Sequence, residues 1–191
     1  MKIELLKNAL SSLKRMEKDA AAFTDFHRAG VLIPLFPSKD GISALFTVRT
    51  DSVETHKGQI SFPGGMVDEN DRDITQTALR EAHEEVGIEP ASVEVLGMLD
   101  DHAVPSNFII TPVVGYLKEK PSISTNSIEV AEVFEVPLSF FLDGKSGWTE
   151  EREWRGKKHK VWYYQYKEHL IWGATAAIIR NLLSIIQKSG S

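Results

Sequence analysis

The stretch of sequence that decides the fold is the acidic run Arg80-Glu81-Ala82-His83-Glu84-Glu85-Val86-Gly87. In an α-helix, at about 100° per residue, Glu81 and Glu85 lie about 40° apart, and Glu84 lies about 60° to the other side of Glu81. The three carboxylates therefore share one helical face. The opposite face is apolar and can pack against a sheet; it carries Leu79, Ala82 and Val86.

Capping signals limit this helix to about residues 74–86. Asp73 is suited to the N-cap position, and Gln76 stands where a capping box requires a glutamine. Gly87 follows the last helical residue as a C-cap, and Pro90 comes shortly after it.

Two interpretations of the acidic face compete, a solvated surface and a metal site. Against a solvated surface, Glu81 has like charges at i+3 and i+4, each of which destabilises an isolated helix by roughly 0.2–0.5 kcal/mol. The helix also follows a loop containing Gly64 and Gly65, where backbone can approach a ligand closely. Clustered carboxylates are hard oxygen ligands, which suit Mg²⁺ or Mn²⁺. We therefore favour a metal site formed by Glu81, Glu84 and Glu85.

Hydrophobic periodicity predicts the elements on both sides of this helix. An amphipathic helix is expected over the first eighteen or so residues, within an N-terminal helical extension of residues 1–25. Strands are expected at 31–36, 44–48, 93–99, 109–117 and 161–166, and a closing helix at 174–187. Without repeats or a linker, this pattern predicts one α/β domain over residues 1–191, with helices packed on a mixed sheet.

Composition excludes several classes of function. With no cysteine, the 191-residue chain has no disulfide, thiolate zinc site or cysteine nucleophile. A net charge of −5 argues against a nucleic-acid partner, since such binding rests on a cationic surface. No signal peptide and no apolar run long enough to span a bilayer is present, so we expect a cytoplasmic protein without a membrane partner.

Residues 65–88 resemble the Nudix box, in which a glycine and a spaced acidic residue precede Arg-Glu-x-x-Glu-Glu-x-Gly and an aliphatic residue. Arg72 stands where the general pattern has glutamate. Asp71 fits that role if one extra residue precedes the helix.

This one-residue expansion resembles the coenzyme A pyrophosphatase branch of the Nudix family, and the similarity covers about residues 31–183. The branch signature is matched by Leu45-Phe46-Thr47-Val48-Arg49, Gly58, Phe62-Pro63-Gly64-Gly65, Asp68, Asp71, Thr111-Pro112-Val113-Val114-Gly115, residues 129–142 and Ile171-Trp172-Gly173-Ala174-Thr175. One position departs from it, because Glu54 stands where many members carry arginine.

The resemblance implies a Nudix-type α/β/α sandwich that uses Mg²⁺ or Mn²⁺ to hydrolyse coenzyme A to 4′-phosphopantetheine and adenosine 3′,5′-bisphosphate. It assigns the metal ligands to Glu81, Glu84 and Glu85, with Arg80 bracing the helix against the loop and Asp71 as its candidate partner. Catalytic roles fall on Arg80, Glu84 and Glu129, and substrate-binding roles on Arg49, Gly64 and Gly65.

Two alternatives stay open. The first is a Nudix diphosphatase for another small nucleotide, such as a nucleoside triphosphate, ADP-ribose or a dinucleoside polyphosphate, which the departure at Glu54 allows. The second is a non-catalytic nucleotide-binding regulator. Such modules usually lose a glutamate of the box, and all three are present here.

The remaining candidates are weaker. Glu129, Glu132 and Glu135 lie where Nudix enzymes often keep a further glutamate, but exposed glutamates around a turn explain each equally well; Glu129 is the one we choose. We interpret a basic cluster as a solvated loop between strands, His56 as a possible pocket residue, and His83 and Trp172 as structural side chains, with Trp172 in the core. The cluster consists of Arg152, Arg155, Lys157, Lys158 and Lys160.

Overall fold

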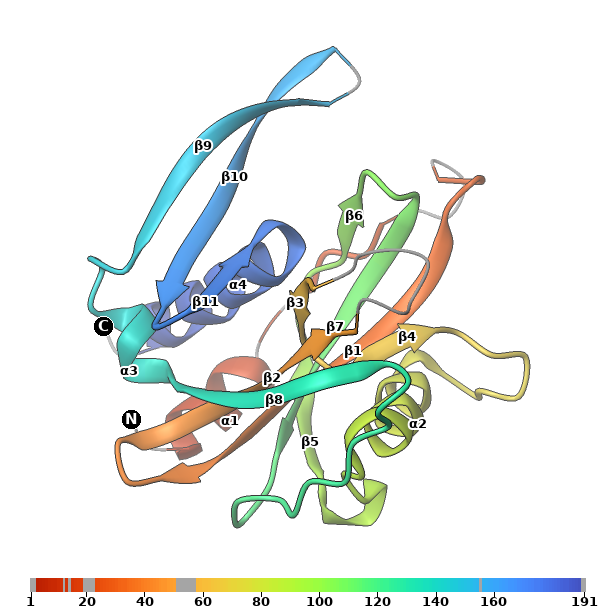
Figure 1. The fold of residues 1–191 in the computed structure, drawn as a ribbon, viewed down its shortest axis with the longest axis vertical. Helices are drawn as coiled ribbons and strands as arrows, with labels where there is room; N and C mark the ends of the chain where they lie inside the picture. Colours follow the sequence, from red (N-terminus) through yellow and green to blue (C-terminus); the bar gives the residue numbers. More distant parts are fainter. Residues whose placement is uncertain are drawn as a thin grey trace.

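The computed structural model describes residues 3–11, 13, 15–18, 23–50, 58–154 and 156–189. Figure 1 shows a central sheet with helices on both of its faces and a second, smaller sheet beside it. Within the described residues, no helix combines the length and apolar character that crossing a bilayer needs.

The main sheet has eight strands in a mixed arrangement. Its central order is β3-β2-β1-β7-β5, while β4 pairs with β1, β6 with β7, and β8 with β2. Strands β1 and β7 run parallel, and the other pairs are antiparallel. The strands are β1 (His27–Ser38), β2 (Gly41–Arg49), β3 (Ile60–Ser61), β4 (Gly64–Met66), β5 (Glu94–Met98), β6 (His102–Val104), β7 (Phe108–Tyr116) and β8 (Val130–Pro137).

The second sheet, in the order β11-β10-β9, is antiparallel. It consists of β9 (Gly147–Trp154), β10 (Lys157–Tyr166) and β11 (His169–Trp172). In Figure 1 the β9–β10 hairpin projects away from the rest of the molecule.

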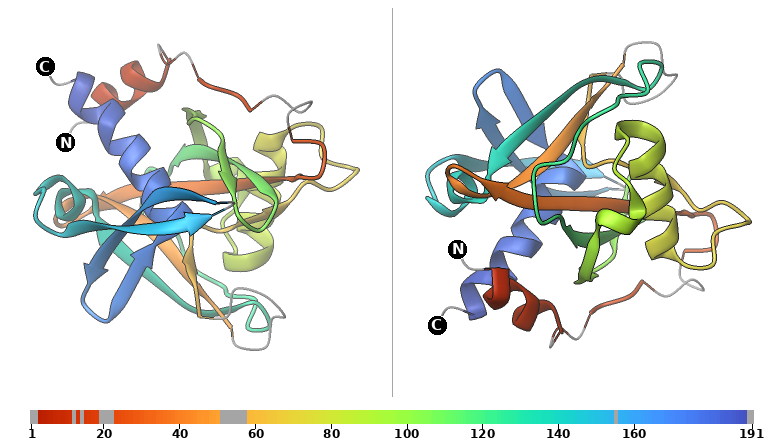
Figure 2. Two further views of the ribbon diagram at one scale, coloured as in Figure 1. Left: turned by 90° about the horizontal axis from the view of Figure 1, so that it is seen from above. Right: turned by 90° about the horizontal axis from the view of Figure 1, so that it is seen from below.

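Helices cover both faces of the main sheet. The two views of Figure 2 place α2 (Ile74–Val86) on one side, and α1 (Ile3–Ser11) and α4 (Gly173–Ser189) on the other. The short helices α3 (Leu138–Leu142) and η2 (Pro90–Ser92) complete the fold. The predicted α/β/α sandwich with a mixed sheet is confirmed.

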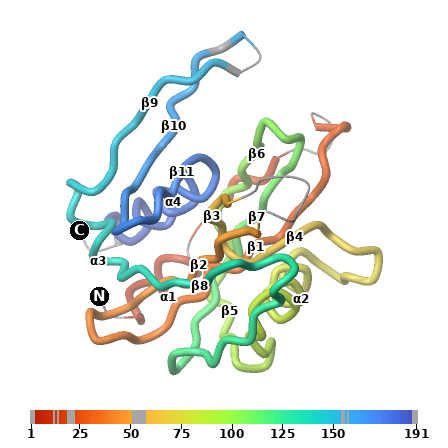
Figure 3. Tube along the Cα trace, viewed as in Figure 1, coloured from red at the N-terminus to blue at the C-terminus, as the bar shows by residue number. Residues whose placement is uncertain are grey.

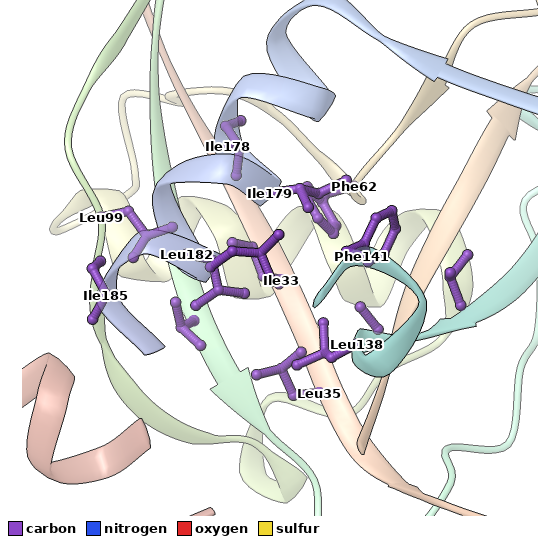
Figure 4. Close-up of a cluster of buried hydrophobic side chains, with 14 of the residues drawn as sticks. Ile33, Leu35, Phe62, Leu99, Leu138, Phe141, Ile178, Ile179, Leu182 and Ile185 are labelled. Atoms are coloured by element: carbon purple, nitrogen blue, oxygen red, sulfur yellow. The ribbon is translucent and has the colours of Figure 1, made fainter. Parts of the chain in front are cut away.

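Two apolar clusters hold these layers together. On the α2 side, Ala78, Ala82 and Val86 pack against buried residues of the sheet such as Leu32 and Val113. The predicted apolar face of this helix is therefore confirmed. On the other side α4 packs its isoleucines and leucines on β1 and α3, as Figure 4 shows for Ile33, Leu35, Leu138, Phe141, Ile178, Ile179 and Leu182.

The N-terminal helix is shorter than predicted. It ends at Ser11, and α1 lies beside α4, near the two chain ends marked in Figure 3. Residues 15–18 are not helical because Asp101 binds this segment. The Asp101 carboxylate accepts hydrogen bonds from Arg15 Nη2 (2.8 Å) and from the Lys18 backbone N–H (2.9 Å). A tertiary contact has overridden the helical pattern.

Periodicity alone missed several strands. The glutamates Glu132 and Glu135, interpreted as residues around a turn, lie in strand β8, which pairs with β2. The segment interpreted as a solvated basic loop forms parts of β9 and β10, with Arg152 opposite His159. Of β10, only the apolar part at 161–166 was predicted; β9 and the start of β10 were missed because their sequences are rich in charge, and pairing with the neighbouring strand makes them strands.

Candidate active site

Helix α2 begins and ends where its caps predict. The Asp73 carboxylate accepts the Gln76 backbone N–H (2.9 Å), and Gly87 adopts φ 73° as its N–H donates to the His83 carbonyl. The capping box is not formed as predicted. The Gln76 side chain instead accepts hydrogen bonds from Arg72 N–H and Nε (3.0 and 2.9 Å). The cap nevertheless fixes the start of the helix that carries the acidic face.

Glu85 points from α2 into the protein and is only 3% exposed. Its Oε2 accepts the Gly64 backbone N–H (3.2 Å), and its Oε1 lies 3.8 Å from Arg49 Nη1. Burial is the main cause that raises the pKa of Glu85 to about 7. A carboxylate this buried, with one hydrogen bond and a distant arginine, favours a further cation.

Arg49 ends β2 on the other side of Glu85. Its Nε is buried and has no hydrogen-bond partner among the described residues. A buried guanidinium N–H without a partner can donate a hydrogen bond to an oxygen of an anionic ligand.

Glu81 lies one turn before Glu85, against β4. The register pairs Gly65 with Gly30, and a Cβ at position 65 would lie 2.5 and 2.6 Å from the two carboxylate oxygens of Glu81. Glycine is therefore required for this approach. Burial also raises the pKa of Glu81, although Arg80 Nη1 donates to its Oε1 at 2.7 Å.

Arg80 connects α2 to the preceding loop. Its Nε and Nη2 donate to the two oxygens of Asp71, each at 3.0 Å, and Nη2 also donates to the Met66 carbonyl (3.0 Å). This bidentate pair holds the pKa of Asp71 well below its usual range. The Arg80–Asp71 contact that the sequence predicts is present, so Asp71 occupies the position expected from the one-residue expansion.

Glu84 and Glu129 border the same region. Glu84 is exposed and lies 3.2 Å from Arg80 Nη1. Glu129 precedes β8, and its charge is close enough to raise the pKa of both Glu81 and Glu85. The structure thus brings the candidate residues of the sequence to one place: Arg49, Gly64, Gly65, Arg80, Glu81, Glu84, Glu85 and Glu129.

Sequence reasoning missed Asn126, which positions Glu129. The Asn126 Nδ2 donates to Glu129 Oε1 (3.1 Å), while its backbone N–H donates to the carbonyl of Glu85 (2.9 Å). The segment before β8 is therefore attached to the end of α2. A lone asparagine in a polar loop gives no sequence signal for this role.

The donor set of α2 fits a hard divalent cation. Glu81, Glu84 and Glu85 offer carboxylate oxygens, and burial raises the pKa of Glu81 and Glu85 even though Arg80 and Arg49 lie beside them. In the described structure their oxygens do not all converge within 4.8 Å. Arg80 Nη1 contacts Glu81 and Glu84, so both carboxylates would have to turn toward a bound ion.

Other candidates lie elsewhere. Glu132 faces His169, and Glu135 pairs with Lys120 (2.7 Å), so neither joins the acidic face of α2. The ring of His83, which we interpreted as a structural side chain, is half exposed, and its Nε2 lies 3.1 Å from Glu89 Oε1. Glu54, His56 and Arg155 lie outside the described residues.

Trp172 is also not in the core, contrary to the prediction. It is 37% exposed because side chains on β11 alternate, so that Ile171 faces the core and Trp172 faces outward. Its ring stacks over that of Tyr163 at 6.0 Å, and Tyr163 in turn stacks against Trp148.

Comparisons with known proteins agree with this geometry. A model of the NUDIX domain matches residues 26–146. An uncharacterized Nudix hydrolase, NudL, from Photorhabdus laumondii subsp. laumondii is 43% identical over 159 residues, covering 83% of this chain and 84% of the relative. Nudix hydrolase 15, mitochondrial, from Arabidopsis thaliana is 38% identical over 91% of this chain, which spans 63% of that protein.

Solved structures show the same fold at lower identity. The crystal structure of a MutT/nudix family protein from Enterococcus faecalis superposes with a TM-score of 0.54 at 14% identity. The match covers 98% of this chain and 75% of that one.

Proposed function

The chain belongs to the Nudix hydrolase family, whose members hydrolyse phosphoric anhydrides, and on this premise we propose that its substrate is coenzyme A or a close derivative. The products would be 4′-phosphopantetheine and adenosine 3′,5′-bisphosphate. The proposed cofactor is Mg²⁺ or Mn²⁺, bound by Glu81, Glu84 and Glu85.

The observation that carries the substrate proposal is the meeting of distant signature segments at β3. Thr175 Oγ1, at the start of α4, donates to the Ile60 carbonyl (2.9 Å). From the other side, Thr47 Oγ1 on β2 lies 3.1 Å from Ser61 Oγ. Two segments that resemble the coenzyme A branch therefore both contact β3, which leads into Phe62-Pro63-Gly64-Gly65. This contact supports a substrate pocket shaped by that branch's residues.

The residues around α2 have distinct roles in the proposed reaction. When bound, the divalent cation would neutralise the diphosphate and make the attacking water a better nucleophile. The guanidinium of Arg49 would bind a phosphate oxygen, and the backbone of Gly64 and Gly65 would let the diphosphate approach α2. Arg80 would position the helix through Asp71, and Glu129 is the candidate for moving a proton.

Loss of individual carboxylates tests the metal site. We expect Glu81→Gln and Glu85→Gln each to lower kcat by orders of magnitude in saturating Mg²⁺ and substrate, since each removes a ligand of the cation that stabilises the developing charge. Glu89→Gln is the matched control, because Glu89 is exposed beyond the end of α2 and its carboxylate pairs with His83, away from the acidic face. Near-wild-type turnover from either α2 variant would exclude this assignment.

A panel of diphosphates tests the substrate. The protein is incubated with Mg²⁺ and coenzyme A, dephospho-coenzyme A, ADP-ribose or a nucleoside triphosphate, and products are separated by chromatography. We expect the highest kcat/KM for coenzyme A, because its 3′-phosphate and pantetheine arm supply binding energy remote from the scissile bond.

The panel also separates the alternatives. If a basic residue binds the 3′-phosphate, dephospho-coenzyme A should lose on the order of 1.5–3 kcal/mol of transition-state binding. If coenzyme A is inert while ADP-ribose or a nucleoside triphosphate is hydrolysed, the branch assignment is wrong and the broader Nudix activity stands. If none of these compounds is hydrolysed but nucleotides still raise the melting temperature of the protein, the non-catalytic nucleotide-binding regulator is favoured.

A further inference from the structure

A second group of metal-ligating side chains lies at the edge of the main sheet, away from α2. Strand β8 pairs with β2 and forms this edge, and its residues Glu132 and Phe134 share one face of the strand. Glu168, in the turn between β10 and β11, and His169, the first residue of β11, lie against this face. These residues line a cavity of about 430 Å³.

His169 is the fixed member of the group. Its ring is 9% exposed and stacks on Phe134, with centroids 3.8 Å apart and planes at 12°. Its Nε2 lies 3.4 Å from Glu132 Oε1 and 3.6 Å from Glu168 Oε1. Both distances exceed the usual 2.7–3.2 Å of an N–H···O hydrogen bond. A buried imidazole nitrogen thus points at two carboxylates without a good hydrogen bond to either.

The spacing fits shared coordination. A Zn²⁺ ion holds nitrogen and oxygen ligands at about 2.0–2.2 Å in a tetrahedron, which separates neighbouring ligand atoms by roughly 3.3–3.6 Å. The two nitrogen-to-oxygen distances fall at this separation. Among the residues that the structure describes, this is the only group of three or more histidine, aspartate or glutamate side chains whose ligand atoms all lie within 4.8 Å.

The local charge balance also favours a cation. Two lysines border the cavity, but Lys120 pairs with Glu135, and Lys167 lies over the ring of Tyr166 at 5.3 Å. In the described part of the chain, neither Glu132 nor Glu168 forms an ion pair with lysine or arginine. In that part of the chain, the carboxylates of Glu132 and Glu168 therefore have one histidine, His169, as their nearby basic group, and a divalent cation would neutralise the charge of both.

We propose that Glu132, Glu168 and His169 bind a divalent transition-metal cation of the Zn²⁺ class, in a site separate from the acidic face of α2. The imidazole selects against Mg²⁺, which prefers oxygen ligands. A cation here joins the edge of the main sheet to the second sheet, because its ligands come from β8, from the β10–β11 turn and from the start of β11. Its expected effect is to stabilise the fold.

The test is Zn²⁺ titration by calorimetry, in excess Mg²⁺ so that the carboxylates of α2 are occupied. Wild-type protein should bind one equivalent of Zn²⁺ and melt at a higher temperature with it. Glu168→Gln and His169→Phe should each weaken binding at least tenfold. Phenylalanine can keep the stacking on Phe134, so this variant separates loss of the ligand from loss of packing. Glu135→Gln, on the same strand and at the same cavity, is the control and should bind as wild type does.

Two further arms locate the bound ion. The double variant Glu81→Gln, Glu85→Gln should bind Zn²⁺ as the wild type does. If this variant does not bind Zn²⁺, the ion is bound at α2 and the proposal is overturned. Wild-type Zn²⁺ affinity in Glu168→Gln or His169→Phe, or no Zn²⁺ binding by the wild type, would overturn it as well. Co²⁺ should give a visible absorption band in the wild type and none in His169→Phe. The result is independent of the substrate proposed above, because no arm of the test measures hydrolysis.

Discussion

Replacing Gly65 with alanine tests whether the close approach of β4 to α2 sets the geometry of the reaction. The new Cβ would lie 2.5 and 2.6 Å from the carboxylate oxygens of Glu81. The carboxylate carbon Cδ would lie closer still, and ordinary van der Waals contact begins at 3.4 Å, so the carboxylate would have to retreat by about 1 Å. The carboxylate is the free end of a side chain and can move, so the loop and strand can keep their paths.

A displacement of this size should reduce activity far more than stability. A misplacement of about 1 Å can lower a rate on the order of 100-fold, and we expect a loss of that order in kcat for Gly65→Ala. The free energy of unfolding should change by less than about 1 kcal/mol, because the clash is relieved by rotating a side chain.

The neighbouring substitution Gly64→Ala supplies the opposite case. A Cβ at Gly64 would meet the Gly30 carbonyl oxygen and would lie 2.6 Å from Val31 Cα, both backbone atoms of the paired strand β1. Backbone in the centre of a sheet cannot rotate away. We therefore expect Gly64→Ala to destabilise the protein by about 1–3 kcal/mol, lowering the melting temperature by about 2–4 °C per kcal/mol.

For both variants, kcat is measured by steady-state kinetics at saturating Mg²⁺, and the melting temperature by thermal unfolding. The reasoning fails if Gly65→Ala keeps the wild-type kcat. It also fails if the Gly65 variant melts as far below wild type as the Gly64 variant does, because the loss of activity would then reflect unfolding.

Three further predictions follow from the charged residues. Without metal, Glu85→Gln should be more stable than wild type above pH 7, because burial raises the pKa of Glu85 to about 7. Urea unfolding in a chelator should show the free energy of unfolding of the wild type falling by up to about 3 kcal/mol relative to this variant as the pH rises from about 4.5 to 7. If the two proteins do not diverge over this range, the raised pKa of Glu85 is contradicted. Asp101→Asn should lower the free energy of unfolding by on the order of 3 kcal/mol, because the buried carboxylate binds Arg15 and Arg28, and an unchanged denaturation midpoint would refute this. Arg80→Lys should lower kcat at least tenfold with little change in melting temperature, since lysine cannot form the bidentate contact to Asp71, and full activity would show that the contact is dispensable.

The sequence by itself determined the elements whose signals are local. The helix at α2 was predictable from its caps and from the 3.6-residue period of its apolar face, and that period also placed three carboxylates on one side. The strands β1, β2 and β7 were predictable because apolar runs there are bounded by turn residues. The Arg80–Asp71 contact followed from the family resemblance, and its two residues are only nine positions apart.

Only the tertiary structure decided what depends on residues far apart in the chain. Burial of Glu85 requires β2 and β4 to cover it, so its raised pKa has no signature in the helix itself. The path of residues 15–18 depends on Asp101, more than eighty positions away, whose hydrogen bonds outweigh a helical period. The group of Glu132, Glu168 and His169 exists because two sheets meet at the edge strand β8. Sequence patterns report the free energy of local conformations, whereas these contacts arise from side chains that packing alone brings together.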